Sequence, residues 1–174
     1  MVDIAILGNQ SIKIKGKQAS FIMDPSKEMP KTSADAIILS NGYDNVDISR
    51  VTDSRIIISG AGGYEVGGIK ISGTTTAKGI LYRISIDGVV IIVGKVAETK
   101  AEGFNACQVA VVNTEGVDFN ESFVTSLEPK LTVLYGPSKI EWAKTLGAQN
   151  TTEVSKITVA KDKLPEKMEI VVLG

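Results

Sequence analysis

The sequence predicts a β-rich α/β domain built from two packed β-sheets with a few helices outside them. Isoleucine and valine number 21 and 18, against 9 leucines, and β-branched side chains suit strands better than helices. Turn residues divide the chain into about a dozen short apolar or alternating runs, which favours two sheets over one. The chain has 174 residues, 43% of them hydrophobic, so we expect a single domain over residues 1–174.

Short runs in the first half of the chain are predicted to be strands. They span residues 3–7, 12–15, 19–23, 36–39, 56–58, 64–66 and 69–71. The run 36–39 is apolar throughout, which is typical of a central strand buried on both faces. Gly67-Gly68 lies between two alternating runs and predicts a tight hairpin. Residues 60–63 are rich in glycine but lead into a strand, so they indicate a turn and not a phosphate-binding loop.

The clearest local signal in the second half is a hairpin. Its strands, 81–86 and 89–93, flank Asp87-Gly88, a pair suited to a type I′ turn. A helix is predicted over 118–127, with Asp118 as N-cap and Glu121 completing a capping box. A second helix, 138–146, should end at Gly147. Further strands are predicted at residues 109–112, 131–134, 156–160 and 169–173.

The composition excludes several kinds of chemistry. The chain has no histidine and a single cysteine, Cys107, so it has no Ser-His-Asp or Cys-His triad and no zinc site built from histidines or several cysteines. Cys107 lies among apolar residues, as a core thiol would. Nineteen Lys plus Arg balance 20 Asp plus Glu, so no nucleic-acid partner is expected. No apolar run is long enough to span a membrane and no leader pattern is present, so we expect a cytoplasmic protein without membrane association.

The order of several segments resembles the metallo-β-lactamase fold superfamily. It resembles more narrowly the small hydrolase-like branch that includes ascorbate-6-phosphate lactonase. The resemblance covers nearly the whole chain and implies an αββα-type sandwich of two mostly antiparallel β-sheets with few outer helices. The segments that carry it are a first strand ending near Gly8, the runs 21–26 and 36–45, the hairpins 63–71 and 81–93 with Gly94 after the second, and Leu127-Glu128-Pro129-Lys130 before a strand.

The same resemblance implies that the metal ligands of the family have been lost. In the family, the loop after the fourth strand carries a T-H-x-H-x-D-H motif, whose ligands hold zinc or a similar ion and activate a hydroxide. Here the matching stretch is Ser40-Asn41-Gly42-Tyr43-Asp44-Asn45, and only Asp44 keeps a ligand-type side chain. The later ligand positions fall in residues 74–79, at Gly94-Lys95 and around residues 134–136, again without histidine.

Two lysines lie at these substituted positions, which suggests a hypothesis about the site. Lys78 and Lys95 could bring positive charge to the place of the ion and satisfy the carboxylate of Asp44. Alternatively, they are two of the chain's 16 lysines that lie in surface loops. The candidate residues of this vestigial site are Asn41, Asp44, Asn45, Lys78 and Lys95, and Glu115 is a weaker addition because it follows a buried strand. We predict no catalytic residue, no bound metal and no cofactor.

Three functions remain open from the sequence. The first is a non-catalytic binding or interaction module derived from these hydrolases, with a small molecule or a protein as partner. The second is a hydrolase of the same superfamily with a histidine-free site, in which Asp44 acts with Lys78 or Lys95. The third is a structural or oligomeric assembly protein, for which Trp142 could anchor a partner or, as is more usual, close the core.

Overall fold

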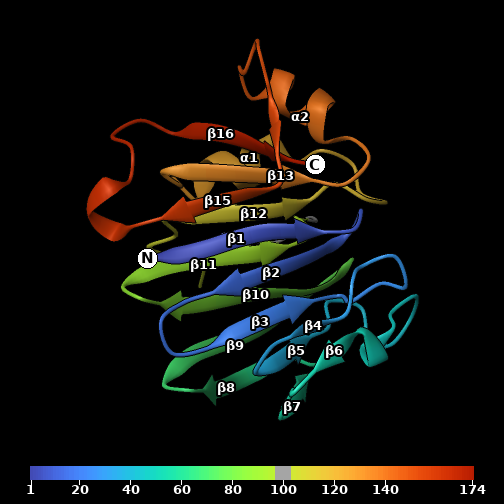
Figure 1. Cartoon of the computed structure of the whole chain (residues 1–174). Coiled ribbons are helices and arrows are strands. Elements are labelled where there is room, and N and C mark those ends of the chain that lie inside the picture. Colours follow the sequence, from blue (N-terminus) through green and yellow to red (C-terminus); the bar gives the residue numbers. More distant parts are fainter. Residues whose placement is uncertain (97–102) are drawn as a thin grey trace.

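The two β-sheets that the sequence predicts are present and face each other (Figure 1). The computed structural model describes residues 1–96 and 103–174. In spatial order, the six-stranded sheet consists of β15 (Lys156–Val159), β1 (Val2–Leu7), β2 (Ser11–Lys15), β3 (Ser20–Met23), β5 (Ala36–Ile38) and β7 (Ile56–Ile58). The eight-stranded sheet consists of β14 (Glu153–Val154), β16 (Glu169–Leu173), β13 (Leu131–Tyr135), β12 (Val109–Asn113), β11 (Val89–Gly94), β10 (Gly79–Ile86), β9 (Ile69–Thr76) and β8 (Gly62–Val66).

The remaining described elements are short. They are the two-stranded ladder of β4 (Thr32–Ser33) and β6 (Val51–Thr52), the helices α1 (Glu121–Ser126) and α2 (Lys139–Thr145), and the 3-10 turns η1 (Ile48–Arg50) and η2 (Lys161–Lys163). Neither α-helix, nor any other helix in the described ranges, has the length and apolar character needed to cross a membrane.

Both sheets are mixed. Hairpin-linked strands pair antiparallel, from β8 to β11 and from β1 to β3. Strands β11, β12, β13 and β16 of one sheet and β3, β5 and β7 of the other pair parallel, and each parallel pair requires a crossover connection. Strands β1 and β15, which are distant in the sequence, pair antiparallel. The expected antiparallel pairing therefore describes the hairpin part of each sheet, and the parallel part brings strand ends together at one edge.

The predicted 81–93 hairpin is confirmed. Ile86 pairs with Val89 across the turn, and Asp87 and Gly88 have φ values of 48° and 78°. A type I′ turn requires positive φ at both central residues, which aspartate tolerates and glycine favours. The local sequence thus determines the register of β10 and β11.

The main core lies between the sheets, and a second core lies under the helices. Inward-facing residues such as Ile4, Phe21 and Ile84 are fully buried between the sheets. On the outer face of the eight-stranded sheet, Phe123 of α1 and Trp142 of α2 pack with residues of the sheet. Over the described residues, both α-helices therefore lie on this one face, and the sandwich expected from the sequence is confirmed.

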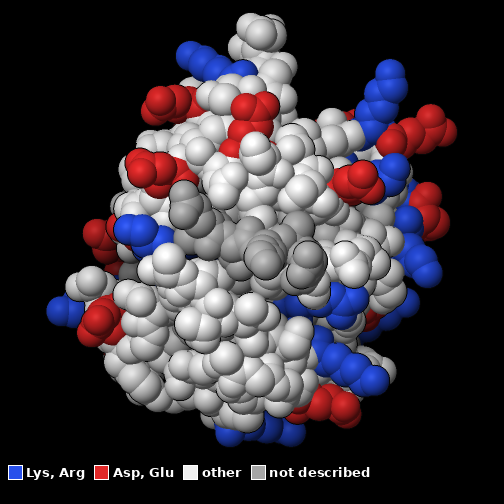
Figure 2. All heavy atoms as spheres, turned by 180° about the vertical axis from the view of Figure 1, so that it is seen from behind, with Lys and Arg blue, Asp and Glu red and all other residues white. Residues whose placement is uncertain are grey.

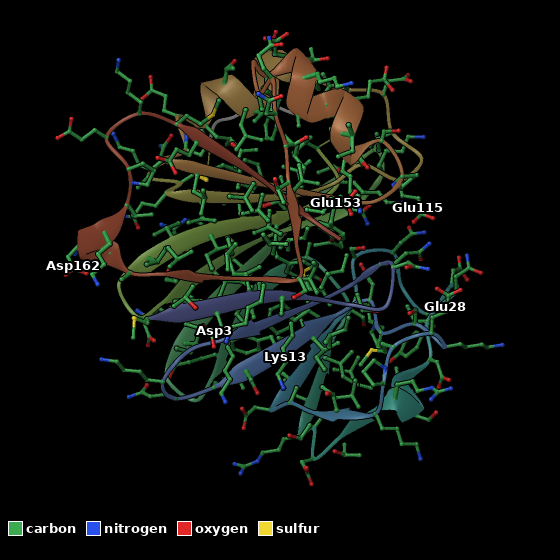
Figure 3. All side chains as sticks on the ribbon, turned by 45° about the horizontal axis from the view of Figure 1, so that its top comes forward. Asp3, Lys13, Glu28, Glu115, Glu153 and Asp162 are labelled. Atoms are coloured by element: carbon green, nitrogen blue, oxygen red, sulfur yellow. The ribbon has the colours of Figure 1, made fainter. Side chains whose placement is uncertain are left out.

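The outer face of the six-stranded sheet is covered differently. Met29 and Ala34, from the loop beside β4, pack over Ile22. On this face β1 and β2 carry polar side chains, among them Asp3 and Lys13 (Figure 3). Strands β1 and β2 are thus polar outside and apolar inside, as expected for a sheet with one solvated face.

Helix α1 begins later than the sequence suggested. We expected Asp118 as N-cap, but the helix begins at Glu121 and Asn120 is the N-cap, accepting a hydrogen bond from the backbone N–H of Phe123 at 3.0 Å. Asp118 and Asn120 are both good caps, and the side chain that reaches a free N–H decides between them. Helix α2 ends as predicted at Gly147, whose φ is 100°.

Candidate functional site

The candidate site lies at the edge where parallel strands of both sheets end. The hydroxyl of Tyr82 donates to the carbonyl oxygen of Leu39 at 2.8 Å, and the N–H of Ile80 donates to the carbonyl oxygen of Ser40 at 2.7 Å. These bonds join the end of β5 to the start of β10, and so to the end of its antiparallel neighbour β11. Glu28 and Glu115 lie at this end of the sandwich and Asp162 lies at the opposite end (Figure 3). The carboxyl ends of parallel strands are where open α/β sheets usually bind ligands.

Asp24, directly after β3, makes several hydrogen bonds at this edge. Its carboxylate accepts hydrogen bonds from the backbone N–H of Ser40 at 2.8 Å and from the Ser40 hydroxyl at 2.5 Å. Its carbonyl oxygen accepts from the Ser11 hydroxyl at 2.8 Å, and Ser11 Oγ accepts from the N–H of Ser26 at 3.0 Å. Asp24 therefore joins the loops that follow β3 and β5 to the start of β2. Its φ of 46° is in the left-handed region, which aspartate tolerates.

The surroundings of Asp24 raise the pKa of its carboxyl group. Burial is the main cause, since it disfavours the charged form. The two hydrogen bonds from Ser40 and the positive charge of Lys95 lower this pKa, and the negative charge of Glu115 raises it. One lysine and one glutamate from the other sheet therefore act on Asp24.

Lys95 and Glu115 come from neighbouring parallel strands. Lys95 follows β11 and is half-buried, and its Nζ lies 3.9 Å from where a Cβ on Gly116 would be. Glu115 follows β12, and its backbone N–H donates to Asn113 Oδ1 at 2.9 Å. Its Oε1 accepts from Gln10 Nε2 at 3.0 Å. The Gln10–Glu115 bond links the β1–β2 turn of one sheet to the β12 end of the other.

Two buried tyrosines fill the inner side of the site. Tyr82 and Tyr135 are at most 1% exposed. Burial raises the pKa of both phenols, and the negative charge of Asp24 raises it further. Both phenols are therefore neutral at physiological pH. Tyr135 belongs to the stretch 134–136, around which the family resemblance gave the last histidine no counterpart.

The residues predicted from the matching loop lie outside this cluster. Asn41, Asp44 and Asn45 are exposed. Asn45 lines a hollow of about 470 Å³ together with Gln10 and residues 26–28. Within the described ranges, no hydrogen bond or ion pair joins Asp44 to either lysine of the hypothesis. In this stretch the Ser40 hydroxyl contacts Asp24, whereas Asn41, Asp44 and Asn45 make no described hydrogen bond to it.

The two lysines have different surroundings. Lys78 is exposed in the β9–β10 turn and lines another hollow, of about 570 Å³, with Phe119 and Glu121. Lys95 alone acts on a buried carboxylate, and that carboxylate belongs to Asp24. The sequence reasoning overlooked Asp24 and Ser40. Asp24 directly follows β3, and Ser40 lies just past β5. A polar residue at the end of a short buried strand is the signal that could have identified both.

The fold's usual metal ion does not fit these residues. Each oxygen of Asp24 already accepts one hydrogen bond from Ser40, and the positive charge of Lys95, which acts on this carboxylate, opposes a further cation. Within residues 1–96 and 103–174, no group of three or more Asp, Glu, Cys or His side chains could hold a metal ion. Zinc and manganese need several such donors around one point.

Comparisons with known proteins agree with the architecture. No family model matches the sequence, and no curated protein matches it. Among solved structures, a metallo-β-lactamase superfamily protein of Thermotoga maritima is 17% identical with a TM-score of 0.78, over 99% of this chain and 98% of that one. The metallo hydrolase Igni18 of Ignicoccus hospitalis is 12% identical with a TM-score of 0.65, over 99% and 96%. YhfI of Bacillus subtilis, a metallo-β-lactamase fold protein, is 9% identical with a TM-score of 0.63, over 98% and 95%.

These likenesses establish the fold. The chain has the metallo-β-lactamase fold, as the order of its segments indicated. The solved structures that resemble it belong to metallo-hydrolases and related superfamily proteins.

Proposed function

We propose that this protein is a metal-free, non-catalytic member of the metallo-β-lactamase fold group that serves as a binding or interaction module. The main support is the set of hydrogen bonds that the Asp24 side chain accepts. Its carboxylate lies at the strand-end edge, and both of its oxygens accept hydrogen bonds from Ser40. A carboxylate used in this way holds two loops together, and by itself it cannot supply the several donors that a metal ion needs.

The chemistry of hydrolysis supports the same proposal. Hydrolases of this fold need a metal-bound hydroxide, and a metal-free substitute would need a general base next to a water site. The chain has no histidine, and the two phenols behind the site stay protonated. We also infer an origin in the small hydrolase-like branch that includes ascorbate-6-phosphate lactonase, because the quoted segments span nearly the whole chain.

The partner proposed for this module is a small molecule or a protein, bound at the same edge, in a cytoplasmic setting. A nucleic-acid partner is disfavoured because the net charge is -1. Seen from behind, the molecule carries both signs of charge around its margin (Figure 2). Such a surface does not attract a polyanion as a uniformly basic face would.

The two alternatives have less support. A histidine-free hydrolase site of Asp44 with Lys78 or Lys95 would need these side chains close together, and the exposed Asp44 and Lys78 make no described contact with each other. An assembly role anchored by Trp142 would need that ring at the surface. Trp142 is 4% exposed and its ring centroid lies 4.6 Å from that of Phe119. Trp142 closes the core under α2.

The proposal is tested by adding metals and substrates to the purified protein. Thermal melting is measured with Zn²⁺, Mn²⁺ or Mg²⁺ and with a chelator, and hydrolysis is measured on lactones, thioesters and phosphodiesters with each ion present. We expect no metal-dependent increase in the melting temperature and no turnover above buffer. Turnover that a chelator abolishes would show that the protein is a metal hydrolase after all.

A further inference from the structure

We propose that a hollow beside the candidate site binds a small organic acid that also carries an amino or hydroxyl group, such as an amino acid or a hydroxy acid. The hollow has a volume of about 470 Å³ and is lined by Gln10, Ser26, Lys27, Glu28, Asn45 and Val46. Glu28 shows its place at the strand-end edge of the sandwich (Figure 3). This inference rests on the proposed function, because it assigns a ligand class to one part of the same edge.

Three segments form the hollow, and hydrogen bonds join them. The turn between β1 and β2 is joined to the loop after β3, because Asn9 Nδ2 donates to Glu28 Oε2 at 2.8 Å. That loop is joined in turn to the segment that carries Asn45, because the N–H of Asp47 donates to the carbonyl oxygen of Pro25 at 2.7 Å. The walls are therefore held in place without a ligand, which lowers the entropic cost of binding one.

The backbone at two positions brings these walls close together. Gly8 has a φ of 66°, and a Cβ there would lie 3.2 Å from backbone atoms of Glu28 and Met29. Glycine therefore lets the β1–β2 turn approach the loop after β3. Asn45 has a φ of 58°, which is in the left-handed region that asparagine tolerates.

Ser26 supplies the observation that points to a ligand. Its hydroxyl oxygen is buried and has no hydrogen-bond partner, and among the described residues it is the one buried side-chain oxygen or nitrogen of this kind. An unpaired buried hydroxyl is costly, and such a group in a native structure calls for an explanation. Since Ser26 lines the hollow, an oxygen of a bound molecule would provide the partner.

The other donors of the hollow indicate a carboxylate. Among the described hydrogen bonds and ion pairs, none involves the side chain of Lys27 or of Asn45. Together with Ser26, these residues offer an ammonium, an amide and a hydroxyl as donors. A carboxylate accepts from all three, and the bond from an ammonium is stronger because both groups are charged.

Two acceptors in the same hollow indicate a second group on the ligand. Glu28 accepts through Oε2 and Gln10 donates through Nε2, which leaves Oε1 of each without a described hydrogen bond. An amino or hydroxyl group donates to such oxygens. It also offsets the repulsion between Glu28 and the carboxylate of the ligand. Because Lys27 and Glu28 cancel in charge, an acid with a second donor fits better than a simple anion.

Binding is tested by NMR titration of isotope-labelled protein with L-serine and with glycolate. Propionate, which lacks the second donor, and ethanolamine, which lacks the carboxylate, are the matched control ligands. We expect L-serine, glycolate or both to cause saturable shifts of the backbone amide signals of residues 8–10, 26–28 and 45–46. The control ligands should cause much smaller shifts at the same concentrations.

Two variants test the donors, and a third is their control. Ser26→Ala and Lys27→Gln should each weaken binding at least about fivefold, because each removes a hydrogen bond to the ligand. Lys31→Gln should leave binding unchanged, since Lys31 is an exposed lysine of the same loop that does not line the hollow. Ser26→Ala should keep the wild-type melting temperature, because its hydroxyl makes no hydrogen bond within the described fold.

Three outcomes would overturn the proposal. They are binding of neither L-serine nor glycolate, equal binding of either control ligand, and unchanged binding in Ser26→Ala. Metal content and hydrolysis are measured on the same samples. Metal-dependent turnover would contradict the proposed function, whereas a metal-free, inactive protein that binds neither probe contradicts only the ligand assigned to this hollow.

Discussion

Replacing Ser40 with alanine tests whether Asp24 depends on its partner for stability. The change removes the hydroxyl that donates to Asp24 Oδ2 at 2.5 Å and leaves the backbone N–H bond to Oδ1 in place. Removing the donor leaves a buried acceptor oxygen without its hydrogen bond, which costs about 1–3 kcal/mol. We expect Ser40→Ala to lower the free energy of unfolding by about 1–3 kcal/mol.

The assay is urea unfolding at pH 7, followed by the fluorescence of Trp142, the only tryptophan in the chain. Its ring is buried next to Phe119, so its emission reports loss of the core under the helices.

Ser49 provides the control. Its hydroxyl donates to Asp47 Oδ1 at the same 2.5 Å, but that pair is exposed. Ser49→Ala should therefore change the free energy of unfolding by no more than about 0.5 kcal/mol. Equal effects of Ser40→Ala and Ser49→Ala would refute the argument that burial makes the Asp24 pair important.

Further predictions concern pH, packing and reactivity. Because burial raises the pKa of Asp24 in the folded state, its contribution to stability is fully present below the unfolded pKa near 3.8 and is lost as the pH rises through the folded value. The free energy of unfolding of Asp24→Asn should therefore improve relative to the wild type between pH 4 and pH 7, and a constant difference would contradict the raised pKa. Gly79→Ala would push a Cβ into the carbonyl oxygen of Ser40, whereas nothing lies within 4 Å of a Cβ on Gly62, whose φ of 127° is similar to the 116° of Gly79. Chemical denaturation should show a loss larger by at least about 1 kcal/mol at Gly79, and equal losses would mean that the close approach to Ser40 does not matter. Burial raises the pKa of Cys107 to about 12, so a thiol reagent at pH 8 should label it only after urea unfolding; rapid labelling of the native protein would show that this thiol is accessible.

The local parts of the fold could be predicted from the sequence. Asp87-Gly88 determines a turn by its own backbone preferences, so the 81–93 hairpin follows from neighbouring residues alone. The apolar run 36–39 likewise identifies a buried strand. The choice of Asn120 over Asp118 as helix cap could not be predicted, because both side chains suit the position and packing of the helix on the sheet decides.

The pairing of strands that are distant in the sequence could not be predicted from local sequence patterns. The parallel ladders of β11, β12 and β13 join segments that are separated in the sequence and are not linked by a tight turn. Their parallel direction follows from crossovers, which amino-acid periodicity does not encode. The family resemblance provided the overall order of segments where periodicity could not.

The candidate site could be predicted only in part, because its contacts also join segments that are distant in the sequence. Matching the loops to the family motif pointed to residues that follow these strands, Lys95 among them, and their role at this edge stays a prediction. It did not identify Asp24, because its link to Ser40 joins residues 16 positions apart across two strands. Asp44 was singled out as the last ligand-type residue in its loop, but an exposed side chain in a turn can point either way. Side-chain direction within a loop depends on the tertiary structure.

The central claim is that this edge of the fold holds no metal ion. The most direct measurement is elemental analysis of protein expressed in medium supplied with zinc, manganese and iron and purified without chelator. We expect every metal to be well below stoichiometric with the chain, and the melting temperature to be the same before and after dialysis against a chelator. A stoichiometric transition metal that is retained through purification, and whose removal lowers the melting temperature, would contradict it.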